Sequence, residues 1–598
     1  MVRKPKEYFK VKPNLEDYEK TYKKFEWEDA HKELDWLNGK NGKKGKGGKK
    51  LNAAYEAVDR HALSWRKNKV ALYWEGEDGT KESYTFLELS ELSSKFADVL
   101  KSLGVKKGDR VFFFMPRIPE LYIGFLGTLK IGAIAGTMFA AFGPEGIKDR
   151  LKDSEAKVLM TTPDLIGRVY KIKRELPKLK SIIVVNRSSR KSKAKRQAKL
   201  PKLKTGEVDY DSAMEKADKN FKIARTDPED YAFILYTSGT TGKPKGVVHA
   251  HYAIVQEHVT SKWVLDLHDE DTYWCTADPG WVTGIAYGIL GIWSAGATSV
   301  VCEGGFNPEK WYSILEKYKV SVWYTAPTAI RMLMAAEGKM LKKYDFSNLR
   351  HLCSVGEPLN PECVYWSLKV FGKPFHDNWW QTETGGILIA NYPCMPIKPG
   401  SMGKPLPSVE AAIVDDDCKK LPAGEEGNLA IAAKKMPAWP SMMRKIWKNP
   451  KKYKSYFKKG WYITGDRAFA DKDGYFWFVG RADDVIKTSG ERVGPFEVES
   501  ALIEHPAIVE AGVIGKPDPI RGEIIKAFVV LAKGYRPSDE LKEKIKQFVK
   551  KHLAGHAYPR EVEFVKSLPK TRSGKIARRI LRARELGLPV GDISTIEK

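Results

Sequence analysis

The sequence predicts an α/β protein with a large N-terminal domain and a small α+β C-terminal domain. The large domain is expected to hold layered parallel sheets and helices together with a small β-rich subdomain. Three observations support this. The chain has 598 residues, more than one hydrophobic core usually organises. From Asn52 onward, apolar strand patterns alternate with helical patterns, as in parallel α/β layers. Beyond residue 400, short strands with frequent turns replace that alternation.

The elements of the large domain follow from its apolar runs. The charged first 50 residues are expected to wrap this domain through the aromatic residues Tyr18, Tyr22, Phe25, Trp27 and Trp36. Buried strands are predicted at 111–115, 132–136, 157–161, 181–185, 231–235, 247–249, 299–301 and 320–324. Residues 119–130 are predicted to form an amphipathic helix with Pro119 near its start.

The last third of the chain divides into two parts. Short strands at 410–414, 427–431 and 474–479 predict the β-rich subdomain. Residues 484–598 fit a compact α+β unit with a helix at 495–503, strands at 510–514 and 525–531, a helix at 538–552 and a basic tail. The stretch between them is polar at its centre, so the predicted domains are 1–482 and 483–598.

Charge leaves two classes of function open. The formal net charge is +27, and the tracts 39–50 and 187–196 carry much of it. Neither tract shows apolar periodicity or interleaved aromatic residues of the kind that stack on bases. We interpret both as solvated loops, whereas a basic nucleic-acid-binding protein remains the alternative. The positive field would also favour anionic substrates.

Composition also indicates where the protein acts. Six cysteines are scattered without a C-x-x-C pair, so we predict reduced thiols. The start of the chain has no apolar segment of the signal-peptide type, and no apolar run is long enough to span a bilayer. We therefore expect a cytoplasmic protein that does not cross a membrane. The histidines and cysteines show no zinc-binding spacing.

A glycine-rich loop between two predicted strands carries the densest set of anion-binding groups. Residues 236–246 read Y-T-S-G-T-T-G-K-P-K-G. Glycines let backbone N–H groups turn toward an anion, while the hydroxyl groups and the two lysines add donors and charge. The spacing differs from that of the G-x-x-x-x-G-K-[ST] phosphate loop. The loop predicts a polyphosphate cradle; a flexible surface turn is the alternative.

Further motifs lie downstream. In D-N-W-W-Q-T-E-T-G-G, residues 377–386, Gln381 and Thr382 can bond a purine edge and a phosphate, and Glu383 can hold a hard cation. The Asp466 carboxylate can accept two ribose hydroxyls. The segment 487–492 reads K-T-S-G-E-R, and Lys575 follows a glycine on a loop crowded with cations. Each motif alone also fits a turn or a surface patch, but their combination in this order is specific.

With these motifs the chain resembles the adenylate-forming superfamily of acyl-CoA synthetases, luciferases and peptide-synthetase adenylation domains. Within it, the chain is most similar to the acetyl-CoA synthetases (acetate–CoA ligases). The resemblance covers nearly the whole chain after the lysine-glycine tract. It implies that ATP and acetate form an acetyl-adenylate and pyrophosphate, that the C-terminal domain is mobile and swings about a hinge, and that coenzyme A then displaces AMP. A ligase for another short-chain acid such as propionate is the alternative.

The resemblance also implies Mg²⁺ as cofactor and acetate, ATP and coenzyme A as small-molecule partners, with neither nucleic acid nor membrane. It makes acetylation of Lys575 by a lysine acetyltransferase, and its reversal by a deacetylase, an expectation. Lys575 would be the catalytic lysine of adenylation, Glu383 the Mg²⁺ ligand and Asp483 the hinge. A structural cation would lie at Ile503, His505 and Ile508, although a histidine there also fits a helix-end cap.

The remaining roles carry over by motif. The β/γ-phosphate clamp would be Thr237, Ser238, Gly239, Thr240, Thr241, Gly242 and Lys243. Other ATP contacts would be Gly356, Glu357, Pro358, Asp377, Asn378, Trp379, Gln381, Thr382, Asp466, Arg481 and Arg492. Val282, Thr283, Val355 and Trp380 would line the acyl pocket, where the Trp380 indole leaves room for little beyond a methyl group. Coenzyme A would contact Thr283, Asn307, Ser489 and Lys550; the last stands where the family often has arginine, which weakens that assignment.

Overall fold

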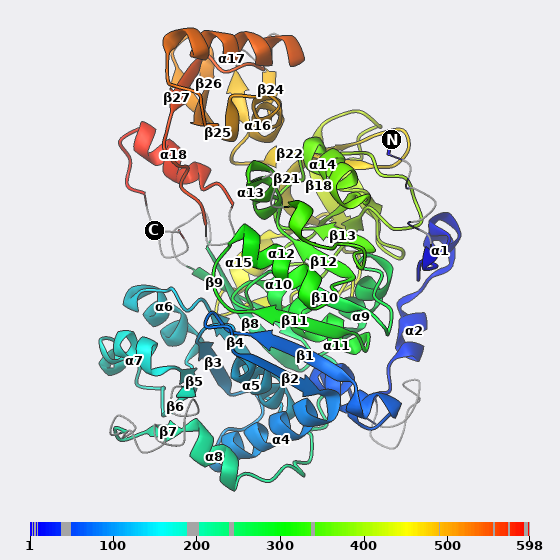
Figure 1. Ribbon diagram of the computed structural model, residues 1–598, viewed down its shortest axis with the longest axis vertical. Coiled ribbons are helices and arrows are strands. Elements are labelled where there is room, and N and C mark those ends of the chain that lie inside the picture. The colour runs from blue at the N-terminus through cyan, green and yellow to red at the C-terminus, as the bar shows by residue number, and fades with distance from the viewer. Residues whose placement is uncertain are drawn as a thin grey trace.

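The computed structural model describes residues 1–2, 4, 8, 10–37, 49–187, 203–238, 244–336, 341–488, 491–553, 557–571, 575–590 and 596. Figure 1 shows a large body made of the N-terminal and central parts of the chain, with a smaller lobe above it that contains the C-terminal strands. The predicted α/β class and the two-part architecture are confirmed. The boundary at Asp483 stays a prediction.

One large sheet has nine strands in the order β16-β15-β14-β13-β12-β10-β11-β1-β2. Its strands are β1 Val70–Glu75, β2 Lys81–Thr85, β10 Thr272–Cys275, β11 Thr298–Cys302, β12 Val322–Thr325, β13 His351–Ser354, β14 Phe375–Trp379, β15 Ile389–Ala390 and β16 Lys404–Pro405. The strands from β1 to β14 along this order pair in parallel, and both edges are antiparallel. The sheet is therefore mixed, with the predicted parallel arrangement at its centre.

A second sheet has eight strands in the order β19-β9-β8-β4-β3-β5-β6-β7. Its strands are β3 Arg110–Phe114, β4 Ile134–Met138, β5 Val158–Thr161, β6 Ser181–Val184, β7 Glu207–Asp209, β8 Tyr231–Ser238, β9 Pro244–Ala250 and β19 Lys445–Ile446. It is parallel from β8 to β7, but β8 and β9 pair antiparallel. A short connection can join only antiparallel neighbours, which explains this hairpin.

Helices cover and join these sheets. The main ones are α4 Phe86–Ser102, α5 Pro119–Lys130, α6 Pro144–Ser154, α7 Pro163–Tyr170, α8 Tyr210–Lys216, α9 Ala253–Trp263, α12 Pro308–Lys317, α13 Pro327–Ala335, α14 Pro361–Phe371 and α15 Pro450–Ser455. Many begin with proline, whose fixed φ suits the first helical position. One hydrophobic cluster contains residues of both sheets, such as Phe113 and Tyr324, together with residues of helices α5 and α9.

The amphipathic character predicted for residues 119–130 is wrong. The helix α5 has the predicted bounds, but all its residues are buried. Its last residue, Lys130, is fully buried and its ammonium group lies 2.6 Å from the Asp59 carboxylate. A buried lysine needs such a partner because an unpaired charge in the core is very costly. The sequence pattern could not show this, because the partner Asp59 is far from Lys130 in sequence.

The β-rich subdomain is confirmed. Its five-stranded sheet has the order β17-β18-β21-β20, and β22 pairs with β21. The strands are β17 Ala411–Val414, β18 Gly427–Ala432, β20 Phe457–Lys458, β21 Trp461–Ala470 and β22 Phe476–Arg481. This sheet supplies Asp466 and Arg481 to the candidate site described below.

The upper lobe is a separate α+β unit with a hydrophobic core of its own. Its sheet has the order β24-β23-β26-β25, with β27 beside β26. The elements are β23 Ile486–Thr488, β24 Glu491–Val493, α16 Pro495–Ile503, β25 Ile508–Asp518, β26 Gly522–Leu531, α17 Asp539–His552, β27 Glu561–Phe564 and α18 Arg578–Glu585. The helix α18 lies in the segment that the sequence analysis treated only as a basic tail.

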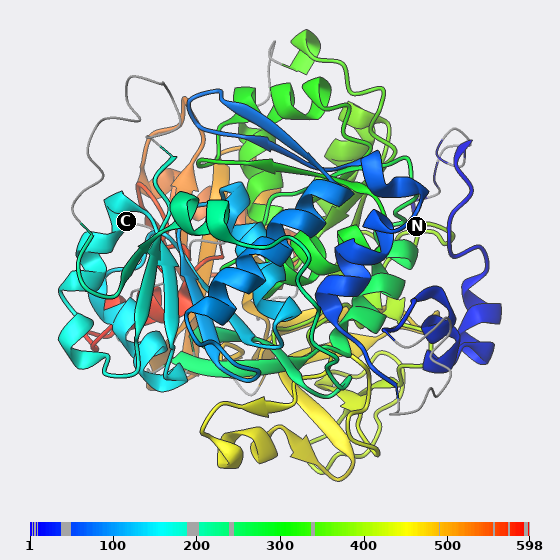
Figure 2. The same ribbon diagram turned by 90° about the horizontal axis from the view of Figure 1, so that it is seen from below.

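The N-terminal segment, with α1 Tyr18–Lys24 and α2 Trp27–Ala30, runs along the outside of the body, as expected (Figure 2). Tyr18 and Tyr22 donate hydrogen bonds to the carbonyls of Pro405 and Val409 at 2.8 and 3.1 Å. Phe25 and Trp36 are buried, and Trp27 is partly buried against the core. The predicted aromatic anchors therefore hold the segment in place.

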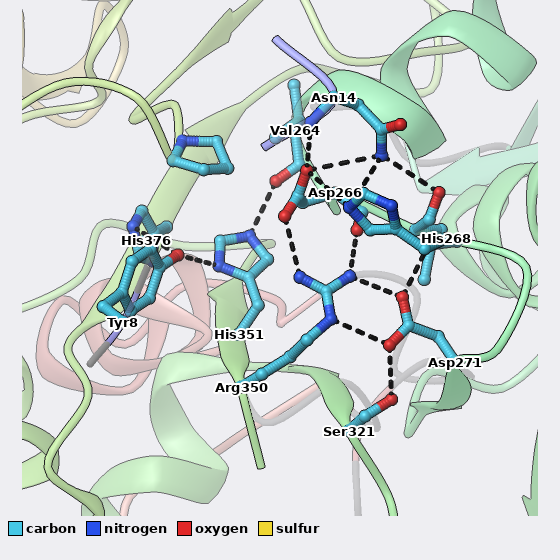
Figure 3. Close-up of polar contacts among 12 residues, drawn as sticks. Tyr8, Asn14, Val264, Asp266, His268, Asp271, Ser321, Arg350, His351 and His376 are labelled. Carbon is cyan, nitrogen blue, oxygen red and sulfur yellow. Dashed lines mark hydrogen bonds and ion pairs between the residues drawn. The ribbon is translucent and has the colours of Figure 1, made fainter. Parts of the chain in front are cut away.

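A buried polar network adds to this attachment (Figure 3). Asn14 donates its backbone N–H to the Asp266 carboxylate at 2.8 Å, and Arg350 pairs with both Asp266 and Asp271. Tyr8 hydrogen-bonds His351, whose pKa burial lowers to about 4. The two carboxylates can be buried because one guanidinium serves both.

Across the described ranges, no helix is long and apolar enough to cross a membrane. All six cysteines are free thiols, in agreement with the prediction.

Candidate active site

The predicted phosphate cradle lies at the tip of the β8–β9 hairpin. Thr237 and Lys245 face each other at its base. Gly239, Thr240, Thr241, Gly242 and Lys243 lie outside the described residues, as does the side chain of Ser238. Burial lowers the pKa of Lys245, nearby Lys452 and Arg481 lower it further, and Glu383 raises it. The hairpin base thus lies within electrostatic range of Glu383 and Arg481, two other predicted site residues.

Asp466 is the point at which three distant motifs meet. Its carboxylate accepts hydrogen bonds from Trp379 Nε1 at 2.9 Å, Gln381 Nε2 at 3.0 Å and Arg481 Nη1 at 2.8 Å. Asp466 on β21 and Arg481 on β22 are direct cross-strand partners. Burial raises the pKa of Asp466, while Arg481 and Trp379 lower it. The three donors favour the carboxylate form and fix its orientation.

Gln381 and Glu383 extend this group along the loop after β14. Gln381 Nε2 also donates to the carbonyl of Thr464, and its Oε1 accepts from the Tyr462 hydroxyl at 2.8 Å. Glu383 Oε1 accepts from the Tyr456 hydroxyl at 3.0 Å. Glu383 therefore offers a carboxylate with spare lone pairs, close to the cations Lys245 and Arg481.

The Glu383 carboxylate fits a magnesium ion whose other ligands are mostly substrate phosphates and water. The described residues contain no group of three or more His, Cys, Asp or Glu side chains arranged to hold a metal. Mg²⁺ is usually bound by one or two carboxylates, together with substrate phosphates and water. The Glu383 carboxylate, close to Lys245 at the base of the predicted phosphate-binding loop, meets that requirement.

Lys575 lies over the loop that contains Gly356 and Glu357. A Cβ atom built on Gly356 would be 3.7 Å from Lys575 Cε, and Gly356 has a φ of +106° that suits glycine. The Glu357 carboxylate is itself held by the Thr328 N–H at 2.7 Å and Arg331 Nη2 at 3.1 Å. The predicted catalytic lysine and one of the segments predicted to contact ATP are thus neighbours.

The Lys575 residue keeps exposed surface, yet many protein atoms surround it. The resulting desolvation lowers its pKa, and Arg481 lowers it further; Glu357, Asp466 and Glu383 raise it. These three carboxylates come from three separate parts of the sequence. An ammonium group among them can pair with one anion while it contacts another on a bound substrate.

Asp377 and Asn378 support the site from within the core. Asp377 accepts hydrogen bonds from Ser354 Oγ at 2.7 Å and the Leu359 N–H at 3.2 Å, and burial raises its pKa to about 7. Asn378 Oδ1 accepts from the Tyr324 hydroxyl at 2.8 Å. Asp377 ties β14 to β13 and to the loop after β13, and Asn378 ties β14 to β12. Their assignment to ATP contact stays a prediction, as does that of Pro358 and Thr382.

The residues predicted to line the acyl pocket come from three separate segments of the chain. Val282 and Thr283 begin α10 Val282–Ile285, Val355 follows β13 and Trp380 follows β14. Val282 and Val355 belong to the large hydrophobic cluster against which Trp380 packs. Trp380 Nε1 donates a hydrogen bond to the Tyr324 hydroxyl at 3.3 Å. The indole is therefore positioned by contacts and is not a loose surface group.

Of the predicted coenzyme A residues, Thr283 lies beside Val282 in α10, whereas Asn307 and Lys550 lie on other elements. Asn307 is exposed and caps α12, with its Oδ1 accepting from the Lys310 N–H at 2.9 Å. Lys550 is exposed in the last turn of α17, which Figure 1 places on the outer side of the upper lobe. Ser489 lies outside the described residues, and so does the side chain of Arg492. The assignment of Asn307, Ser489 and Lys550 to coenzyme A contact stays a prediction.

Two more predictions concern the small lobe and its connection. Asp483 is exposed between β22 and β23, and its carboxylate lies 3.9 Å from Arg481. His505 follows α16; its Nδ1 accepts from the Ala507 N–H at 3.2 Å, and burial lowers its pKa. This contact agrees with a helix-end role. The hinge at Asp483 and the cation site at Ile503, His505 and Ile508 stay predictions.

Sequence reasoning missed several residues that hold the site together. Thr328 and Arg331 on α13 fix Glu357, and Tyr456 holds Glu383. Arg578 Nε donates to Glu499 at 2.8 Å within the upper lobe, and Arg578 lies 3.9 Å from Asp484. None belongs to a compact motif, so only tertiary proximity identifies them.

This fold and site define the class: the chain belongs to the AMP-binding enzyme family. The model for "AMP-binding enzyme" matches residues 58–447, and that for "AMP-binding enzyme C-terminal domain" matches residues 497–575. The chain is 57% identical over 586 residues to an acetyl-coenzyme A synthetase of Bacillus subtilis (strain 168), with 98% of each chain covered. It is 46% identical over 571 residues to an acetyl-coenzyme A synthetase of Methanothrix thermoacetophila, covering 92% of this chain and 85% of the relative.

Solved structures show the same architecture. An anthranilate CoA ligase in complex with anthranoyl-AMP superposes with a TM-score of 0.80 at 31% identity, covering 90% of this chain and 97% of that one. An acyl-CoA synthetase of Brucella canis superposes with a TM-score of 0.72 at 35% identity, covering 96% and 99%. The fold is thus shared over both the large body and the small lobe.

Proposed function

We propose that the chain is an AMP-forming acetate–CoA ligase. It joins acetate to coenzyme A through an acetyl-adenylate and releases AMP and pyrophosphate. The observation that carries this proposal is the position of Lys575 over the Gly356 loop, within electrostatic range of the carboxylates of Glu357, Asp466 and Glu383. This arrangement suits a step in which a carboxylate attacks a phosphate. Two anions must then approach each other, and fixed cations offset their repulsion.

The residues divide the work of adenylation as follows. The hairpin loop from Thr237 to Lys243 holds the β- and γ-phosphates of ATP. Asp466 holds the ribose hydroxyls, oriented by Arg481, Trp379 and Gln381. The Lys575 ammonium group bridges the acetate oxygen and the α-phosphate as charge develops there. A carboxylate becomes a good acyl donor only in the resulting mixed anhydride, which the thiol of coenzyme A then attacks.

Glu383 is the residue proposed to hold Mg²⁺. When bound, the ion supplies positive charge that neutralises the phosphate oxygens during displacement. The Tyr456 hydroxyl orients the Glu383 carboxylate from one side and leaves its other lone pairs available.

The proposed acyl pocket explains why acetate is the substrate. Trp380 closes the far end with Val282, Thr283 and Val355 around it, so a methyl group fills the space. Each further buried methylene would otherwise contribute about 0.8 kcal/mol of favourable transfer. Rejection of longer acids must therefore come from steric overlap. Propionate would be tolerated and butyrate rejected.

Regulation and location complete the proposal. Acetylation of Lys575 would remove the charge that adenylation needs, so a lysine acetyltransferase and a deacetylase are proposed partners. The exposed surface of Lys575 keeps it within reach of such enzymes. Free cysteines throughout the described structure support a cytoplasmic location.

The test is pyrophosphate release from ATP with a panel of two- to six-carbon acids, measured with and without coenzyme A. We expect release with acetate in the absence of any nucleic acid, and thioester formation when coenzyme A is added. Release only with propionate would replace acetate by the alternative substrate. No release with any short acid would contradict the proposal.

A further inference from the structure

The wall of the acyl pocket rests on a second layer of aromatic residues. The Tyr287 ring meets the Trp380 indole edge to face, with centroids 5.1 Å apart at 83°. The Tyr324 ring meets Tyr287 in the same manner at 5.9 Å and 86°. Aromatic pairs prefer this geometry, which restricts how the rings can turn. Both tyrosines are fully buried, so neither can move without repacking the core.

A directed chain of hydrogen bonds fixes the nitrogen end of the indole. Asn378 Nδ2 donates to the carbonyl of Ser354 at 2.9 Å, so its Oδ1 is the acceptor for the Tyr324 hydroxyl at 2.8 Å. The oxygen of that hydroxyl then accepts from Trp380 Nε1 at 3.3 Å. Each group has one possible direction of donation. The indole N–H is thereby held by β12 through Tyr324 and by β14 through Asn378.

A second directed chain fixes the Tyr287 ring. The backbone N–H of Ile387 donates to the Tyr287 hydroxyl at 2.8 Å. Thr260 Oγ1 donates its proton to the carbonyl of Gln256 at 2.7 Å. The Tyr287 hydroxyl is therefore the donor in its 2.8 Å hydrogen bond to Thr260 Oγ1. Tyr287 is thus tied to α9 on one side and to the turn after Trp380 on the other.

The backbone around Tyr287 is unusual. Tyr287 lies in a π-helical turn, Ala286–Leu290, that continues α10 directly. Such turns are rare and are often found at functional sites. Val282 and Thr283, proposed to line the pocket, therefore lie in the same helical segment as the tyrosine that supports the opposite wall. The segment positions both sides of the pocket relative to each other.

We propose that Tyr287 and Tyr324 are positioning residues for acyl-chain selection: they fix the Trp380 indole and so set the depth of the acyl pocket. This inference rests on the proposed function. The steric limit on chain length requires that the indole keep one orientation, because a rotated indole would leave room for further methylene groups. The two tyrosines restrain it by a ring contact and by a hydrogen bond.

The test uses Tyr324→Phe, which removes one hydroxyl and keeps the ring. It leaves the indole N–H and the Asn378 oxygen without their partner. We expect the ratio of kcat/KM for acetate to that for butyrate to fall about tenfold, the size of effect that small changes in an apolar pocket produce. KM for acetate should rise more than kcat falls, because the loose pocket first weakens binding. Tyr287→Phe should lower the ratio about threefold, since the ring remains but loses its anchor.

Tyr392→Phe is the matched control. It also removes a buried tyrosine hydroxyl in the same core, one that donates to the carbonyl of Pro405 at 3.2 Å. The Tyr392 ring packs against Tyr18. Its acetate-to-butyrate ratio should equal that of the wild type. The same shift in this variant would show that general loosening of the core, and not the indole, controls the ratio.

A double-mutant cycle shows whether the tyrosines act through Trp380. In a Trp380→Gly background, Tyr324→Phe should no longer change the ratio, because the group that it positions is absent. An unchanged shift in that background, or a wild-type ratio in both single tyrosine variants, would overturn the inference. A wild-type enzyme that activates no short acid would instead overturn the proposed function.

Discussion

The Asn360 side chain links the large body to the small lobe: its Nδ2 donates a 2.8 Å hydrogen bond to Ser500 Oγ on α16. Asn360 is almost fully buried, and its Oδ1 accepts from Arg331 Nη1 at 2.9 Å. Arg331 Nη2 lies 3.1 Å from the Glu357 carboxylate. A chain of polar contacts thus runs from the loop beneath Lys575 to the lobe that carries Lys575. These contacts connect the two parts in the arrangement in which Lys575 lies over Gly356.

Ser500→Ala should slow adenylation and spare the coenzyme A step. The variant leaves the Asn360 amide without its partner across the two domains, and a net hydrogen bond contributes about 1 kcal/mol, or about fivefold in rate. Only adenylation, the step expected to use the present pose of the small lobe, should slow by this factor. The measurement compares acetate-dependent pyrophosphate exchange with thioester formation from supplied acetyl-adenylate. Ser500→Thr keeps the hydroxyl and should restore exchange; equal losses in both assays would argue against a pose-specific bond.

Lys575→Ala should abolish acetyl-adenylate formation, with a fall of about a thousandfold, because preorganised charge at the reacting phosphate is lost. Thioester formation from supplied acetyl-adenylate should remain if, as predicted, thiol attack uses another pose of the lobe. Lys570→Ala is the control on the same loop: its ammonium group pairs with Glu510 within the lobe. It should retain adenylation. Equal loss of both half-reactions in Lys575→Ala would indicate a structural role for this lysine.

Asp483→Pro should restrict the swing of the small lobe. Proline fixes φ near −65° and removes the backbone N–H, which limits the change that a hinge must absorb. Adenylation should survive because the present pose already places Lys575 at the site, whereas the coenzyme A step should fall about tenfold or more. Asp483→Ala, which removes the same carboxylate beside Arg481, should run both steps normally. Normal rates in the proline variant would mean that the hinge lies elsewhere.

Trp380→Gly should convert the enzyme toward longer acids. Removing the indole opens the far end of the pocket, so butyrate and longer acids gain room. Acetate should lose about tenfold or more in kcat/KM, because it no longer sits in a near-attack geometry. The measurement is the rate with each two- to six-carbon acid. The variant must first be shown to be folded, by cooperative thermal unfolding. A folded variant with unchanged preference for acetate would remove Trp380 from the pocket.

Stability should decline between about pH 6.5 and 4 in part through His351. Burial lowers its pKa in the folded protein from 6.5 to about 4. In this window the unfolded chain binds the proton and the folded chain does not, so the free energy of unfolding falls as pH falls, by about 3 kcal/mol at most. His351→Gln should have a flatter profile there, measured by denaturant unfolding at several pH values. Parallel profiles for the two proteins would contradict this account.

Most secondary structure was predictable because local patterns agree with the tertiary structure. The bounds of α5 and α16 match the prediction, since a proline marks each start and apolar residues dominate each helix. The burial of every face of α5 was not predictable, because the partner of Lys130 is Asp59, far away in sequence. The antiparallel edges of the sheets also escaped prediction, since strand direction depends on which strands become neighbours.

The candidate site also contains residues that the sequence predicted and residues that it did not. Asp466, Gln381 and Arg481 were singled out by motif, but their shared hydrogen bonds depend on the fold, which brings the loop after β14 beside β21 and β22. Arg331, Asn360, Ser500, Tyr287 and Tyr324 carry no motif and were missed. Their roles come from distances between residues that the chain order keeps apart.

The sequence by itself determined the fold class and the order of the motifs, because strand and helix periods and the spacing of glycine, lysine and carboxylate residues are local properties. The kind of chemistry followed from the resemblance that these motifs carry. Only the tertiary structure decided that Lys575 lies over Gly356 and that Asp466 collects three donors. It also decided that two buried tyrosines hold Trp380. Packing and hydrogen bonding between distant segments fix these relations, because burial forces each polar group to find a partner wherever the fold supplies one.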